Sequence, residues 1–142
     1  MTERAVTAFA PATVSNVACG FDVLGFALDR PGDEVTARVV SRSGVTISAI
    51  EGDDGRLPRD ASRNTAGIAA QALLSRLGER RGIQLVIRKG LPLSSGLGGS
   101  AASAVAAVVA VDALLESRSS LETLLACSFE GERHGEGSAH AD

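Results

Sequence analysis

The sequence predicts an α+β fold for the 142-residue chain, and three observations support this fold class. Segments rich in valine, isoleucine and threonine, which are typical of strands, are concentrated near the N-terminus. A segment with helical spacing then precedes one more strand, and two further helix-like segments follow. Because the strands come first and do not alternate regularly with helices, this order favours α+β over a regular βαβ array.

Three strands are expected before the first helix. Segment 4–10, RAVTAFA, has strand-like composition and is expected to end at Pro11. Segments 33–40 and 44–50 carry the β-branched residues that favour extended chain. The polar stretch 51–62 that follows contains the glycine, proline and aspartate residues of turns, so it is expected to be a loop.

Helical spacing is clearest in segment 64–77. Gly78 and Gly82 bracket its end, and the strand after them is expected to place Ile83, Leu85 and Ile87 on one face. The apolar positions of the helix recur at i, i+3, i+4, i+7, i+8 and i+11, and they are Ala66, Ala69, Ala70, Leu73, Leu74 and Leu77,.

Two more helices are expected in the C-terminal part of the chain. The first covers segment 99–116, and its alanine and valine content indicates a buried helix. The second begins near Ser119, because Ser119 and Glu122 have the spacing of a capping box.

Composition limits the classes of function. Hydrophobic residues make up 44% of the chain and charged residues 22%, as in a globular domain, and the formal net charge is −3,. This charge gives no reason to expect nucleic acid or an anionic membrane as a partner. Cys19 and Cys127 fit no metal-binding spacing and no disulfide framework, and no signal peptide is evident, so we expect a cytoplasmic protein.

The stretch KGLPLSSGLGGSAASAVAAVVAV, residues 89–111, contains the strongest functional signal. A helix N-terminus carries unpaired N–H groups and partial positive charge, and glycines allow an anion to approach the backbone closely. The residues alone leave two interpretations open, a phosphate-binding loop or a flexible turn. The Walker A pattern is absent, and a dinucleotide fingerprint is disfavoured because six residues, Pro92 among them, separate Lys89 from Gly96.

Three motifs resemble those of a known family. Residues 92–103, PLSSGLGGSAAS, resemble the phosphate-binding motif P-x-x-x-G-L-G-S-S-A of the GHMP kinases, with Gly99 in place of the first of the two serines. Residues 10–29, APATVSNVACGFDVLGFALD, resemble the N-terminal motif of the homoserine kinases within that superfamily. Residues 137–142, GSAHAD, resemble their third motif. Homoserine kinases use ATP and Mg²⁺ to phosphorylate L-homoserine, on the route to threonine.

The resemblance implies roles for individual residues. Asn16, Asp22 and His140 would contact homoserine. Asp22 would lie near the hydroxyl or the amino end of the substrate, where it could orient the hydroxyl group. Ser100 and Glu132 would bind Mg²⁺, and Asn64 would lie near the adenine base. The residues implied to hold the ATP phosphates are Pro92, Ser95, Gly96, Leu97, Gly98, Gly99, Ser100 and Ala101.

Each of these residues also has a simpler interpretation. Asn16 and Asp22 lie in a glycine-containing stretch where such residues commonly form turns. Glu132 would ordinarily be a solvent-facing residue of a polar tail, and His140 would be solvent-facing near a terminus. Without the resemblance, all four would be assigned these structural roles.

The resemblance also implies a domain organisation. GHMP kinases have an N-terminal α+β domain similar to ribosomal protein S5 domain 2, with a left-handed βαβ unit, and a second, C-terminal domain. Residues 1–142 correspond to about the first half of a family member, so we expect a truncated ATP-binding domain with little or no kinase activity and exposed apolar surface,. Two alternative functions stay open, another GHMP-type small-molecule kinase and a non-catalytic nucleotide-binding fragment. The full-length protein could also form a homodimer.

Overall fold

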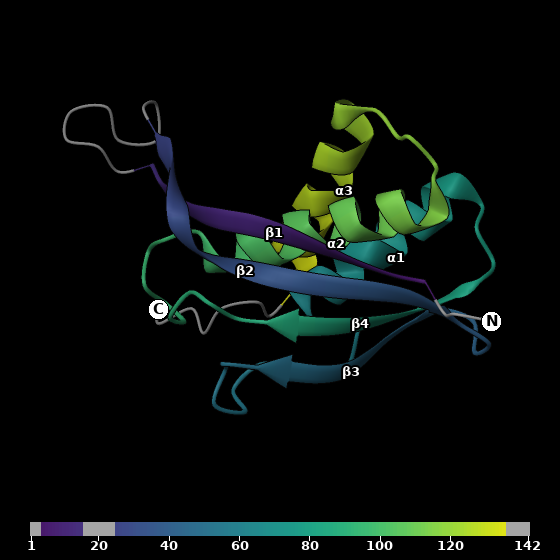
Figure 1. Ribbon diagram of the computed structural model, residues 1–142, viewed down its shortest axis with the longest axis horizontal. Coiled ribbons are helices and arrows are strands. Elements are labelled where there is room, and N and C mark those ends of the chain that lie inside the picture. Colours follow the sequence, from purple (N-terminus) through teal and green to yellow (C-terminus); the bar gives the residue numbers. More distant parts are fainter. Residues whose placement is uncertain (1–3, 16–24, 136–142) are drawn as a thin grey trace.

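A computed structural model describes residues 4–15 and 25–135 of the chain. The described part consists of one four-stranded sheet and three helices (Figure 1). In chain order the elements are β1 (Ala5–Val14), β2 (Phe26–Val40), β3 (Val45–Glu51), α1 (Thr65–Leu77), β4 (Gly82–Arg88), α2 (Gly99–Leu115) and α3 (Leu121–His134).

The sheet has the strand order β1-β2-β4-β3. β1 pairs with β2 and β2 pairs with β4 in antiparallel fashion, whereas β3 and β4 are parallel. A parallel pair needs a crossover connection, and α1 provides it. The expected α+β fold is confirmed, with a β3–α1–β4 crossover as its helical connection within the sheet.

The helices pack in layers over the sheet. α2 lies against β1 and β2, α1 lies against β3, and α3 packs on α1 and α2. The interior joins Val35 and Ala37 of β2 to Leu73 and Leu74 of α1, all at most 2% exposed. The expected strand face is confirmed, because Ile83, Leu85 and Ile87 of β4 are buried in the same cluster.

Two strands are longer than their sequence patterns predict. β1 continues through Pro11 to Val14, because it is an edge strand of the described sheet and proline is tolerated there,. β2 begins at Phe26, well before residue 33, because its first residues pair with the end of β1: Thr13 lies opposite Ala27 and Val14 opposite Phe26. This pairing is non-local and leaves no local sequence signal.

The predicted capping box at the start of α3 is wrong by one residue. Ser120 is the N-cap, and its Oγ accepts a hydrogen bond from the Thr123 N–H at 3.1 Å. The backbone N–H of Ser119 instead donates to Asp112 Oδ1 at 3.0 Å. Burial raises the pKa of Asp112, but hydrogen bonds from Ser117 and Ser119 outweigh it, so the pKa is lowered overall.

α3 extends to His134 and therefore includes Glu132, so the expectation that Glu132 belongs to a polar tail is wrong.

No helix in the described part of the chain is long and apolar enough to cross a membrane.

Candidate nucleotide site

The glycine-rich loop connects the end of β4 to the start of α2. Three of its residues have left-handed backbone conformations, Ser94 with φ of 58°, Gly96 with φ of 75° and Gly98 with φ of 71°. The loop bends around a cavity of about 180 Å³. The lining residues are Lys89, Pro92, Leu93, Ser94, Ser95, Gly96, Gly98, Gly99 and Ser100.

Gly98 is the residue that brings the loop against β1. It is the N-cap of α2, and a Cβ at this position would collide with Thr13 Oγ1. Next to it, the Leu97 carbonyl accepts a hydrogen bond from the Thr13 N–H at 2.9 Å. Both the backbone conformation and the close contact therefore require glycine here.

The N-terminus of α2 is suited to an anion. The N-cap Gly98 has no side chain that could accept from the N–H groups of the first turn, and that turn contains no acidic residue. The first residues of this 17-residue helix, Gly99 and Ser100, line the loop cavity, so the unpaired N–H groups and the positive end of the helix lie at its wall,. A phosphate group is the anion for which such a loop and helix end are best suited.

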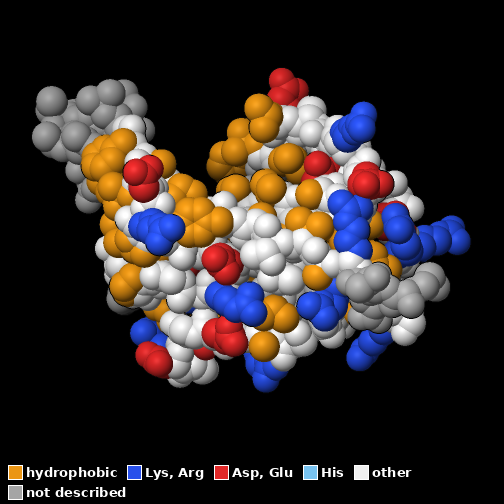
Figure 2. Space-filling model, in the orientation of Figure 1, with side chains coloured by type: hydrophobic (Ala, Val, Ile, Leu, Met, Phe, Trp, Pro, Cys, Tyr) orange, Lys and Arg blue, Asp and Glu red, His pale blue; other side chains and the backbone are white. Residues whose placement is uncertain are grey.

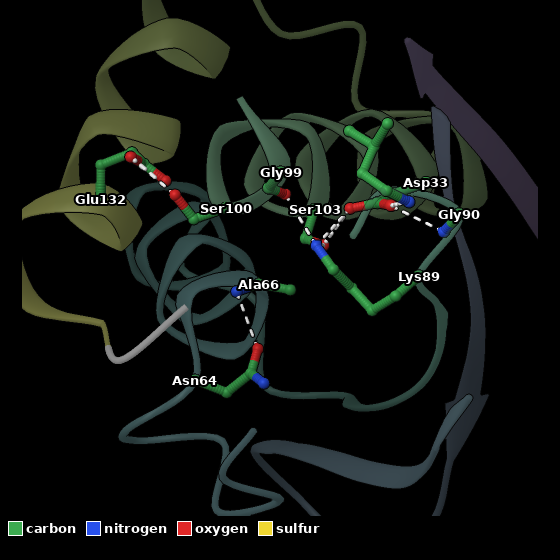
Figure 3. A network of polar contacts seen from close by, with 10 residues as sticks. Asp33, Asn64, Ala66, Lys89, Gly90, Gly99, Ser100, Ser103 and Glu132 are labelled. Carbon is green, nitrogen blue, oxygen red and sulfur yellow. Dashed lines mark hydrogen bonds and ion pairs between the residues drawn. The ribbon is translucent and has the colours of Figure 1, made fainter. Parts of the chain in front are cut away.

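Ser100 and Glu132 come together from two helices. Ser100 Oγ in the first turn of α2 donates to Glu132 Oε2 in α3 at 3.1 Å (Figure 3). The approach of α3 depends on Gly131, where a Cβ would collide with the Thr65 carbonyl of α1. The two candidate magnesium ligands therefore lie next to each other in the fold, and their role toward the ion stays a prediction.

The oxygen chemistry of this pair fits Mg²⁺. The ion prefers oxygen ligands and is usually bound by one or two protein groups together with phosphates and water. In the described residues no three histidine, cysteine, aspartate or glutamate side chains form a metal cluster. A magnesium ion held by Ser100 and Glu132 would take further ligands from phosphate oxygens and water.

A buried polar cluster that the sequence patterns missed lies beneath the loop. Lys89 forms an ion pair with Asp33, and both side chains are almost fully buried, at 1% and 0% exposure (Figure 3). Ser103 Oγ of α2 donates to Asp33 Oδ2 at 2.9 Å and accepts from Lys89 Nζ at 2.9 Å. We call these three residues the Asp33–Lys89–Ser103 cluster.

Asn64, the residue predicted near adenine, caps helix α1. Its Oδ1 accepts hydrogen bonds from the N–H groups of Ala66 and Gly67 at 2.9 and 3.4 Å. Its Nδ2 donates to the Pro58 carbonyl at 3.0 Å, and the residue is 3% exposed. The side-chain amide therefore has a structural role, and its role toward a nucleotide stays a prediction. Asn16, Asp22 and His140 lie outside the described residues.

A second, larger cavity of about 790 Å³ lies away from the glycine loop. β3, the segment 59–62 and α1 surround it, with Thr46, Asp60 and Gln71 among the lining residues. The pKa of the exposed Asp60 is lowered by hydrogen bonds from the side chain and backbone of Ser62. This cavity has neither a glycine loop nor a helix N-terminus among its lining groups.

Comparison with known proteins assigns the family. The family described as the GHMP kinases N terminal domain matches residues 64–142, more than half of the chain, and this range includes the glycine loop and α2. The chain belongs to the GHMP kinase family. The expected resemblance to the GHMP kinases is therefore confirmed.

Several curated relatives of the chain are named homoserine kinase. The homoserine kinase of Xanthomonas campestris pv. campestris (strain B100) is 50% identical over 139 residues, covering 98% of this chain and 43% of that protein. The homoserine kinase of Chloroherpeton thalassium (strain ATCC 35110 / GB-78) is 49% identical over 149 residues, covering 98% and 47%. The chain thus spans somewhat less than half the length of these curated relatives.

Solved structures agree with this assignment. The crystal structure of homoserine kinase from Cytophaga hutchinsonii superposes with a TM-score of 0.91 at 51% identity, covering 99% of this chain and 45% of that one. Mevalonate kinase from Staphylococcus aureus gives a TM-score of 0.66 at 19% identity, covering 95% and 47%. At that identity the second likeness shows a shared fold and nothing further.

Proposed function

We propose that the chain is the ATP-binding part of a homoserine kinase, which transfers the γ-phosphoryl group of ATP to the side-chain hydroxyl of L-homoserine. The observation that carries the proposal is the glycine loop opening α2 in a chain about 50% identical to proteins named homoserine kinase. The domain assignment for residues 1–142 belongs to the same proposal. The likeness to mevalonate kinase extends only to the fold, so another GHMP-type substrate is the less favoured alternative.

The phosphates of ATP would lie in the loop cavity. Backbone N–H groups of Gly96, Gly98, Gly99 and Ser100 would surround them, and the end of α2 would stabilise their negative charge,. Phosphoryl transfer depends mainly on positioning and charge stabilisation, and this loop would supply both for the phosphates of ATP.

Ser100 and Glu132 would hold Mg²⁺ between α2 and α3. The ion, when bound, would neutralise charge on the phosphate oxygens. The hydrogen bond between Ser100 Oγ and Glu132 Oε2 supports this assignment, because it places the two oxygens next to each other. Asn16, Asp22 and His140 are proposed to contact homoserine, with Asp22 orienting the hydroxyl group.

Three wider statements belong to this proposal. The family implies a small-molecule substrate and ATP as partners, and we propose L-homoserine as that substrate, with no nucleic acid or membrane involved. A cytoplasmic place in threonine biosynthesis follows from this substrate. A homodimer of the full-length protein is proposed on the resemblance alone.

The test is a coupled assay of ADP release by the full-length protein that the gene encodes. We expect release that depends on both ATP and L-homoserine, and a Glu132→Gln variant should require a higher magnesium concentration. ADP release with mevalonate or galactose, but none with homoserine, would contradict the proposal.

A further inference from the structure

The Asp33–Lys89–Ser103 cluster contacts both ends of the glycine loop. At the first end, Asp33 Oδ1 accepts hydrogen bonds from the N–H groups of Gly90 and Leu91 at 2.9 and 3.1 Å. At the second end, Lys89 Nζ donates to the carbonyl of Gly99, the first residue of α2, at 2.8 Å. Ser103, one turn further along α2, completes the connection to Asp33 (Figure 3).

The hydrogen-bonding capacity of Lys89 is fully used inside the protein. An ammonium group has three N–H donors. Its three acceptors here are Asp33 Oδ2, the Gly99 carbonyl and Ser103 Oγ. Lys89 lines the loop cavity, yet its side chain is 1% exposed and its charge is paired with Asp33. This geometry argues against a direct role for Lys89 as a phosphate ligand.

The position of the cluster follows from the register of the sheet. β2 and β4 pair so that Glu34 lies opposite Arg88 and Val35 opposite Ile87. The same register continues to Asp33 and Lys89, which therefore share the buried face of Val35 and Ile87. α2 covers this face and brings Ser103 onto the ion pair.

We propose that Asp33, Lys89 and Ser103 are positioning residues for the phosphate-binding loop. They set the separation between the end of β4 and the start of α2, and with it the direction of the loop N–H groups, without contacting the nucleotide. The described contacts hold the conformation of the loop itself. The effect of that conformation on ATP binding rests on the proposed function.

Ser103→Ala is the most selective variant for a test, because it removes one hydroxyl from an alanine-rich helix. Ser128→Ala is the matched control. Ser128 is also a helical serine, 6% exposed against 5% for Ser103, and its Oγ donates to the Leu124 carbonyl at 2.9 Å in α3. The melting temperatures of the two variants establish that both are folded.

Amide hydrogen exchange of the nucleotide-free chain is the first measurement. In Ser103→Ala we expect exchange of the amides in residues 93–100 to be faster by about tenfold, since a hydrogen bond to a charged group is lost, and no change in Ser128→Ala. Equal loop exchange in the wild type and Ser103→Ala would overturn the proposal. A loop equally affected by both variants would do so as well.

Binding of ATP with Mg²⁺ is the second measurement. We expect Ser103→Ala to raise the dissociation constant by about tenfold and to shift the ³¹P resonances of the bound β- and γ-phosphates, with Ser128→Ala unchanged. Weakened binding with unaltered loop exchange would mean that the cluster contacts the phosphates, and would overturn the positioning role. Absence of ATP binding in the wild type would contradict the proposed function alone, and the exchange result would still decide this inference.

Discussion

Gly98 and Gly99 are adjacent in the loop but differ in what they tolerate. Gly98 has φ of 71°, and an added Cβ would collide with Thr13 Oγ1. Gly99 has no positive φ, and its added Cβ would lie 3.5 Å from Lys89 Nζ and 3.7 Å from Leu91 Cβ, at ordinary contact distance. An alanine side chain would therefore fit at Gly99.

This difference predicts opposite effects of the same substitution. Gly98→Ala should lower the free energy of unfolding by about 1–3 kcal/mol, because alanine is strained in the left-handed region. Gly99→Ala should be neutral or raise it by about 0.5–1 kcal/mol, because the unfolded chain loses freedom. Urea denaturation of both variants is the measurement, and equal destabilisation would show that the assigned backbone conformations are wrong.

Lys89 and its neighbour Arg88 provide a second pair of matched substitutions. Lys89→Met leaves the Asp33 carboxylate buried without its cation and should cost about 3–5 kcal/mol. Arg88 pairs with Glu51 at 2.8 Å on the surface, with the two side chains 49% and 60% exposed, so Arg88→Met should cost less than about 1 kcal/mol,.

A double variant separates charge from packing at this site. Asp33→Asn combined with Lys89→Met removes both charges and should recover part of the loss caused by Lys89→Met alone. Chemical denaturation of the single and double variants measures the change in the free energy of unfolding. If the change in the double variant equals the sum of the changes in the two single variants, Asp33 and Lys89 do not interact as described.

At the scale of the element, Asn64 determines where α1 begins. Asn64→Ala should lower the free energy of unfolding by about 1 kcal/mol, because the N–H groups of Ala66 and Gly67 lose their acceptor,. Asn64→Asp keeps that acceptor and should cost less. Thermal denaturation measures both effects.

The Asn64→Asp variant also separates helix capping from adenine binding. If Asn64 only caps the helix, the affinity for ATP should be the same in Asn64→Asp and the wild type. A large loss of affinity in a stable Asn64→Asp protein would support the predicted adenine contact and oppose a purely structural role.

Elements defined by local spacing could be predicted from the sequence, and those defined by pairing could not. The i, i+3, i+4 pattern located α1, and the alternation of Ile83, Leu85 and Ile87 located β4. The early start of β2 has no local signal, because it depends on pairing with β1. The cap of α3 was displaced because the side chain of Asp112 binds the Ser119 N–H.

The residues of the candidate site also fall into two groups, those that a local sequence pattern marks and those that only the fold brings together. The loop residues are contiguous, so the sequence marked them as a candidate phosphate-binding loop, and the family resemblance favoured this interpretation over a flexible turn. The approach of Ser100 and Glu132 followed from the family resemblance. Asp33 and Lys89 are 56 residues apart, and no local pattern joins them, because only the register of β2 and β4 places them opposite each other.

At the scale of the whole molecule, exposed apolar side chains gather on one face. Leu121, Leu125 and Phe129 form a stripe along α3 and are 84%, 54% and 57% exposed. Phe9 and Phe26 of the β1–β2 pair are about half exposed. Figure 2 shows hydrophobic side chains on both sides of a hollow between α3 and the end of this strand pair. Such a surface favours association.

We expect the chain to self-associate through this face as its concentration rises. Leu125→Gln combined with Phe129→Ser should reduce association, because both side chains are exposed and their replacement leaves the core intact. Sedimentation velocity over a concentration series measures it, with Glu122→Gln on the same helix as the control. A wild-type chain that stays monomeric throughout would contradict the expectation.

The most direct test of the central claim, that the loop before α2 binds the phosphates of ATP, is a titration of the ¹⁵N-labelled chain with ATP and Mg²⁺. We predict saturable shifts of the amide resonances of Gly96, Gly98, Gly99 and Ser100, with those lining the larger cavity unchanged. Shifts centred on Thr46, Asp60 and Gln71 of that cavity, or no shift at millimolar ATP, would contradict the claim.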